Sequence, residues 1–138
     1  MLNEIILASK SGIRKKILEK NQIKCIVEHS NIDEDSVKES LLKNKATPEI
    51  ISKNLAELKA NKISQKRNGD LVLGADSVID LKGKIISKPI NRKEALEILR
   101  DLNGQTHHLI SSVCISQNGS MVWNYTDKAS LTMKQMRE

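Results

Sequence analysis

Aromatic side chains are almost absent from this sequence of 138 residues, which contains one Trp, one Tyr and no Phe. Proteins that bind single-stranded nucleic acids without sequence preference stack the bases on aromatic side chains. The scarcity therefore argues against an extended nucleic acid as a partner. Proline and glycine are also few, at 2 and 6 residues, which excludes a collagen-like chain or a proline-rich linker. The core must be built mainly from Ile, Leu and Val.

Cysteines and long apolar segments are equally scarce. Cys25 and Cys114 lie far apart and form no CxxC motif, so we expect free thiols rather than a zinc site or a redox pair. No apolar run approaches the ~18 residues of a membrane-spanning helix. Positive charges follow the short apolar stretch 5–8 instead of preceding it, which is unlike a signal peptide. We therefore expect a cytoplasmic protein that does not enter a membrane.

Three familiar signatures of nucleotide-binding proteins and hydrolases are missing. The sequence contains no GxxxxGK[ST], no GxGxxG and no GxSxG. His107 and His108 are adjacent in an expected strand, where neighbouring side chains point to opposite faces. The pair therefore does not favour a shared metal site.

The charge balance is positive but modest. The chain carries 23 Lys and Arg against 17 Asp and Glu, giving a net charge of +6. This charge suits a small polyanion such as a nucleoside triphosphate. A basic nucleic-acid module is a competing hypothesis that rests on the charge alone, and it predicts an affinity that falls steeply with salt.

The order of apolar runs and helix signals predicts a mixed α/β domain, with one β-sheet flanked by helices. Strands are expected at 5–8, 23–28, 71–75 (continuing or re-pairing over 78–81), 84–87, 107–116 and 120–125, with a last strand end at 129–133. Helices are expected at 13–20, 48–65 and 92–102, and the pattern permits another at 36–44. The helix at 92–102 should turn Ala95, Leu96, Ile98, Leu99 and Leu102 inward. We expect residues 1–138 to form one domain.

The junction between the first strand and the first helix is a candidate anion site. Ser9, Ser11 and Arg14 lie where a buried strand turns into a helix, and helix N-termini offer free N–H groups to phosphates. An Arg one turn into the helix can fork onto phosphate oxygens. The simpler interpretation is a serine cap with a solvated arginine, which the spacing alone favours.

Further candidates are charged residues near the ends of expected strands. Asp76 follows an apolar strand, where it could hold a metal ion or take a proton from water, or merely cap a turn. Glu34, in an expected loop, could supply a second carboxylate. Lys88 follows a short expected strand, where Pro89 could orient it, and Lys59 lies on an expected helix; for both, a solvated lysine is the usual finding.

Read together and in order, these segments resemble the Maf family of nucleoside triphosphate pyrophosphatases. The family's opening pattern LASxSxxR is matched by Leu7–Arg14, and its acidic pattern by Ile32-Asp33-Glu34. Its pattern LAxxKA is matched by Leu55–Ala60, and GADT-V by Gly74–Val78, with Ser in place of Thr. The pattern KP is matched by Lys88-Pro89, and SGxxHxVxTGV resembles Asn103–Val113. Each motif alone is weak, but six in the correct order across nearly the whole chain are specific.

The resemblance implies a Maf/ITPase-like fold and a hydrolase that cleaves nucleotides between the α and β phosphates. It implies a divalent metal cofactor, Mg²⁺ or Mn²⁺, held by Glu34 and Asp76. Asp76 would also act on the attacking water. The residues implied in phosphate binding are Ser9, Ser11, Arg14, Lys59 and Lys88.

Several features depart from the family pattern. Ile13 and Ser77 stand at positions tied to base preference, which leaves 7-methyl-GTP-like and dTTP- or UTP-like substrates open. Ser112 replaces a glycine and is expected to crowd a close backbone approach. The family's C-terminal part, with its glycine-rich segment and last helix, is not in this sequence. A catalytically impaired protein that binds nucleotides or a partner is therefore the alternative, and an uncovered sheet face would favour a homodimer.

Overall fold

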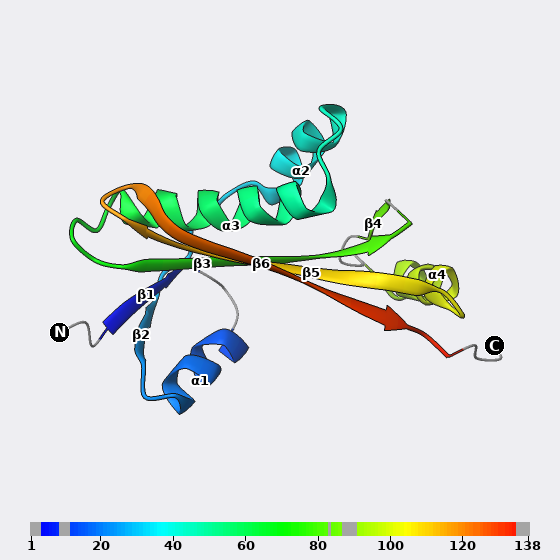
Figure 1. Cartoon of the computed structure of the whole chain (residues 1–138), viewed down its shortest axis with the longest axis horizontal. Helices are drawn as coiled ribbons and strands as arrows, with labels where there is room; N and C mark the ends of the chain where they lie inside the picture. The colour runs from blue at the N-terminus through cyan, green and yellow to red at the C-terminus, as the bar shows by residue number, and fades with distance from the viewer. Residues whose placement is uncertain (1–3, 9–11, 83, 87–90, 135–138) are drawn as a thin grey trace.

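The computed structural model describes residues 4–8, 12–82, 84–86 and 91–134, and these form one sheet with four helices (Figure 1). The strands are β1 (Glu4–Ala8), β2 (Lys24–Val27), β3 (Val72–Leu81), β4 (Lys84–Ile86), β5 (Thr106–Gln117) and β6 (Ser120–Thr132). The helices are α1 (Gly12–Lys20), α2 (Glu34–Lys43), α3 (Pro48–Ser64) and α4 (Arg92–Leu102).

The sheet mixes parallel and antiparallel pairs, which confirms the predicted fold class. Its strand order is β2-β1-β3-β5-β6, and β4 pairs with β3 off this path. β1 pairs in parallel with β2 and β3, whereas the β3–β5, β3–β4 and β5–β6 pairs are antiparallel. Figure 1 shows α2 and α3 on one side of the sheet and α1 on the other.

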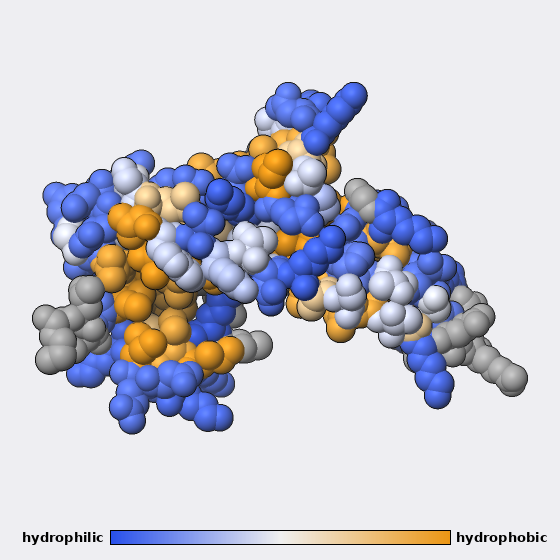
Figure 2. All heavy atoms as spheres, in the orientation of Figure 1, coloured by the Kyte–Doolittle hydropathy of each residue, from blue (hydrophilic) through white to orange (hydrophobic). Residues whose placement is uncertain are grey.

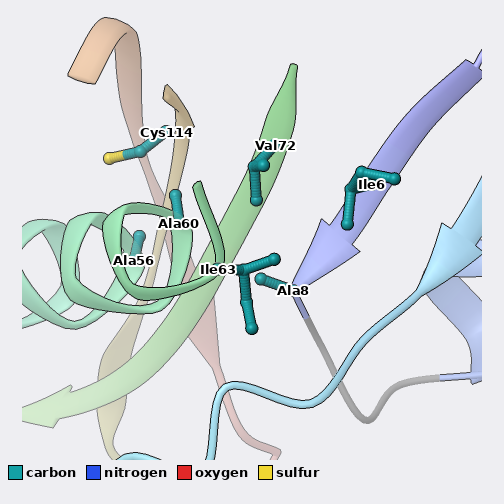
Figure 3. Close-up of a cluster of buried hydrophobic side chains, with 7 residues drawn as sticks. All are labelled: Ile6, Ala8, Ala56, Ala60, Ile63, Val72 and Cys114. Carbon is teal, nitrogen blue, oxygen red and sulfur yellow. The ribbon is translucent and has the colours of Figure 1, made fainter. Parts of the chain in front are cut away.

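The core lies between α3 and the central strands. Ile6, Ala8, Ala56, Ala60, Ile63, Val72 and Cys114 form one buried cluster there (Figure 3). Small residues let α3 approach very closely: a Cβ added to Gly74 would lie 2.3 Å from the Ala56 carbonyl oxygen and 2.8 Å from the Ala60 nitrogen. Only glycine fits at this crossing, so Gly74 fixes the distance between α3 and β3.

Local sequence signals start and end the elements as expected. The Thr47 side chain caps α3 by accepting from the Ile50 N–H, with Pro48 at the first helical position. The Asn91 side chain caps α4 in the same way. Asn118 and Gly119 have φ angles of 53° and 83° and make a two-residue hairpin turn between β5 and β6. Residues 120–132 form one strand rather than the two separate pieces that the sequence indicated.

Some apolar residues expected to face inward are exposed. Leu96 and Leu99 of α4 are exposed, and Leu102 is the one buried residue of that helix. The inward prediction for these two leucines is wrong, because α4 lies near the far end of the sheet, away from α3 (Figure 1). Trp123 and Tyr125 of β6 are also exposed and stack on each other. Figure 2 shows further apolar surface around α1, β1 and β2. Among the described helices, none has the length and apolar character to cross a membrane.

Candidate active site at the open edge of strand β3

Asp76 lies inside β3, not at the strand end that the sequence indicated. The strand continues through this position because β5 pairs along it, with Asp76 opposite Ser112. The other edge of β3 is different: β1 pairs with it only as far as Gly74, and β4 begins to pair at Ile79. Asp76 therefore lies in the segment of β3 between Gly74 and Ile79, where no strand among the described residues pairs with this edge.

Lys59 reaches Asp76 from α3. Its Nζ lies 3.2 Å from Asp76 Oδ1 and 3.3 Å from the Ala75 carbonyl oxygen, and both charged side chains are buried. Lys59 follows Ser52 by seven residues, which is two helical turns, so both lie on the face of α3 that meets β3. The structure thus places Lys59 in the core-facing stripe rather than on a solvated face.

Glu34 completes the cluster from α2. The sequence placed it in a loop, but α2 begins at Glu34, because the Asp33 side chain caps the helix by accepting from the Ser36 N–H and hydroxyl. Helix α2 therefore starts two residues before the expected position 36. Glu34 Oε1 lies 2.7 Å from Lys59 Nζ. One ammonium group joins two carboxylates that are far apart in the sequence.

The Asp76 carboxyl group is electrostatically unusual. Burial raises the pKa of Asp76 above its ordinary value, and the nearby ammonium groups of Lys59 and Lys38 partly oppose this rise. Lys38 lies one helical turn after Glu34 on α2. Asp76 Oδ2 is buried and has no hydrogen-bond partner among the described residues. A buried carboxylate oxygen of this kind is available to a ligand, either a cation or a water molecule.

A network of buried hydroxyl groups holds the backbone under Asp76. Ser52 Oγ lies 3.2 Å from the Asp76 carbonyl oxygen and 2.9 Å from Ser112 Oγ, which lies 2.9 Å from Thr126 Oγ1. Ser112, which replaces the family's glycine, uses its hydroxyl in this network. The sequence analysis missed Ser52, although its position on the same helical face as Lys59 was a signal for it.

Replacing Ser52 by alanine should destabilise the fold by about 1–2 kcal/mol, because the Asp76 carbonyl loses a buried partner. Chemical denaturation of the variant measures this free energy. The control is Ser130→Ala on exposed β6, which should change it by less than about 0.5 kcal/mol. Equal effects of the two substitutions would show that the hydroxyl network does not hold β3.

Other candidate residues are not brought to the cluster by the described structure. Ser77 faces the opposite side of the sheet from Asp76, where its Oγ lies 2.9 Å from Ser111 Oγ. Arg14 lies in the first turn of α1, on the side of the sheet away from α3 (Figure 1). Ile13 is in the same turn, but its side chain is not described, and Ser9, Ser11 and Lys88 fall outside the described residues.

The donor set at the cluster fits a cation that takes few protein ligands. Within the described ranges, no three His, Cys, Asp or Glu side chains gather to hold a metal ion. Glu34 and Asp76 nevertheless offer two carboxylates, one with a buried oxygen that lacks a partner. Mg²⁺ is commonly held by one or two carboxylates together with phosphate oxygens of a substrate and water. The two carboxylates therefore fit such a cation if its other oxygen ligands come from a bound molecule and water.

Comparison with known proteins shows which family this sequence matches. The family described as Maf-like protein matches residues 4–138. A nucleoside triphosphate pyrophosphatase of Pelagibacter ubique is 77% identical over 99% of this chain, which covers 70% of that protein. A 7-methyl-GTP pyrophosphatase of Brucella abortus is 34% identical over 99% of this chain and 68% of that protein.

Solved structures agree at the level of the fold. The Ham1 protein of Staphylococcus aureus aligns with a TM-score of 0.57 and 14% identity, over 94% of this chain and 70% of that one. A nucleoside-triphosphatase, also titled dITP/XTP pyrophosphatase, from Mycobacterium abscessus aligns with a TM-score of 0.56 and 13% identity over 94% and 73%. The ITPase-like architecture, the ordered motifs and the high identity to a relative agree, and the chain belongs to the Maf-like protein family.

Proposed function

We propose that the protein is a nucleoside triphosphate pyrophosphatase, a hydrolase that cleaves the α–β phosphoanhydride to give a nucleoside monophosphate and pyrophosphate. The cluster of the buried Asp76 and Lys59 with the partly exposed Glu34 carries the proposal, because paired carboxylates with an adjacent cation suit hydrolysis of a polyphosphate. The names of the relatives that share the family support the same reaction.

Asp76 is the proposed catalytic residue. Its buried carboxylate would orient the attacking water and accept its proton, and Oδ2 is the atom left available for this. Glu34 and Asp76 would hold a divalent cation, Mg²⁺ or Mn²⁺. When bound, that cation neutralises charge on the phosphates and makes water more acidic. The protein's own contribution is to fix the carboxylates and keep the site partly shielded from solvent.

The remaining proposed contacts concern the phosphates and the base. Ser9, Ser11, Arg14, Lys59 and Lys88 would bind phosphate oxygens, by N–H, hydroxyl and charge-assisted hydrogen bonds. Ile13 and Ser77 would contribute to base preference. For Ser77 this requires the base to lie on the sheet face opposite α3, where α1 also lies (Figure 1).

The setting of the molecule is also part of the proposal. We place the protein in the cytoplasm, where nucleoside triphosphates are abundant and the free thiols of Cys25 and Cys114 persist. We propose a homodimer, supported by the exposed Trp123 and Tyr125 on β6. No extended nucleic acid is required.

Pyrophosphate release from a panel of nucleoside triphosphates tests the proposal and identifies the substrate class. The panel contains 7-methyl-GTP, dTTP and UTP, each with Mg²⁺, with Mn²⁺ and with a chelator. We expect release from one or a few of them, and we expect the chelator to abolish it. Saturable nucleotide binding without release would favour the alternative, a nucleotide-binding protein that lacks turnover.

A further inference from the structure

The Lys59 ammonium group has no free hydrogen-bond donor. A lysine ammonium carries three N–H donors and no acceptor. Three protein oxygens lie around Lys59 Nζ: Glu34 Oε1 at 2.7 Å, Asp76 Oδ1 at 3.2 Å and the Ala75 carbonyl oxygen at 3.3 Å. Lys59 can therefore bind a phosphate only after it releases at least one of these oxygens.

The same ammonium group competes with a metal ion for the carboxylates of Glu34 and Asp76. Mg²⁺ binds its oxygen ligands at ~2.1 Å, so a Mg²⁺ ion on Glu34 Oε1, which lies 2.7 Å from Lys59 Nζ, would be within about 4.8 Å of that ammonium nitrogen. The two cations repel each other at such short range, so the ammonium group lowers the affinity of the two carboxylates for the metal. Asp76 Oδ2 is buried on the same carboxyl group and is left without a partner among the described residues.

We propose that Lys59 is a positioning residue that acts as a placeholder for the divalent cation. Without nucleotide, its ammonium group holds Glu34 and Asp76 together and weakens binding of the metal. When a triphosphate arrives, Lys59 exchanges its carboxylate contacts for phosphate oxygens, and the two carboxylates become free for the metal. Metal and nucleotide then bind with positive coupling, and by linkage each raises the affinity for the other by the same factor. This inference rests on the proposed function.

The matched variants are Lys59→Met and Lys53→Met. Methionine has almost the length of lysine but no charge. Lys53 lies on the same helix, and its side chain is not part of the Lys59 cluster. Binding of Mn²⁺ alone, in the absence of nucleotide, is measured from the free Mn²⁺ signal in electron paramagnetic resonance titrations. The placeholder predicts that Lys59→Met binds Mn²⁺ at least about 10-fold more tightly than the wild type, whereas Lys53→Met does not differ. Equal or weaker Mn²⁺ binding by a folded Lys59→Met variant would overturn the proposal.

A second measurement uses the wild-type protein, so it does not depend on the variant folding. Lysines are acetylated with a limiting reagent, and the modified positions are quantified by mass spectrometry. Mn²⁺ at a concentration that saturates the wild-type site should raise the labelling of Lys59 several-fold, because the metal displaces its buried ammonium group, and should leave Lys53 unchanged. Unchanged labelling of Lys59 at saturation would contradict the placeholder.

The outcomes separate this inference from the proposed function. If the metal displaces Lys59 but the protein releases no pyrophosphate, the placeholder role of Lys59 is supported and the pyrophosphatase activity is contradicted. If pyrophosphate release depends on the metal but Lys59→Met does not change the Mn²⁺ affinity, the enzymatic activity is supported and the placeholder role is contradicted.

Discussion

Replacing Asp76 by asparagine is expected to reduce turnover by at least about 100-fold, the usual contribution of a positioned general base. Asparagine preserves the shape of the side chain and the acceptor oxygen that faces Lys59, but it cannot take a proton. The free energy of unfolding should change by less than about 1 kcal/mol, because the charge that is lost is one that burial already disfavours. Steady-state pyrophosphate release and chemical denaturation measure the two quantities on the same sample.

Asp127→Asn is the control for this experiment. Asp127 lies on the exposed strand β6, so the same chemical change should affect neither turnover nor stability. Wild-type turnover in Asp76→Asn would remove Asp76 from the mechanism. A loss of turnover accompanied by unfolding would instead assign Asp76 a structural role.

Replacing Gly74 by alanine should have the largest effect on stability. The free energy of unfolding should fall by at least about 3 kcal/mol, the upper end of the usual range for overpacking. The new Cβ would lie 2.3 Å from the Ala56 carbonyl oxygen. Because this oxygen belongs to the helix backbone, it cannot move away by a side-chain rotation. Helix α3 would have to move off β3, which would also draw Lys59 away from Asp76. Chemical denaturation and pyrophosphate release should therefore both show a loss.

Two comparisons isolate the steric cause. Gly69→Ala places a Cβ in open space at a φ of +82°, so it should cost only the ~1–2 kcal/mol of a left-handed backbone. The double variant with Ala60→Gly should not recover the stability of Gly74→Ala, because the two closest atoms belong to the helix backbone. Equal costs for Gly69→Ala and Gly74→Ala would show that the close approach does not limit the packing of α3.

Local signals predicted the elements well where one residue type determines the geometry. Thr47 and Pro48 start α3, Asn91 caps α4, and the left-handed pair Asn118-Gly119 forms the hairpin turn. Each of these depends on contacts within a few residues, which a sequence displays directly. The strand order and the close helix crossing at Gly74 depend on partners far away in the chain, so the sequence alone did not contain them.

The sequence named three residues that the structure brings together, but it did not predict their geometry. The resemblance to the Maf family selected Glu34, Lys59 and Asp76, and the structure joins all three through one ammonium group. Asp76 was misplaced at a strand end, because the pairing of β5 carries β3 beyond the last residue of β1. Ser52 was missed because its place on the helical face of Lys59 indicates a buried serine, but not the strand oxygen that the hydroxyl contacts.

The products of nucleotide hydrolysis test the central claim most directly. A nucleoside triphosphate that the protein turns over is incubated with it and Mg²⁺, and the nucleotide and phosphate products are separated and quantified. Cleavage between the α and β phosphates predicts nucleoside monophosphate and pyrophosphate in equal amounts, with neither product formed by Asp76→Asn. Nucleoside diphosphate and inorganic phosphate, or no turnover of any triphosphate by the folded protein, would contradict the account.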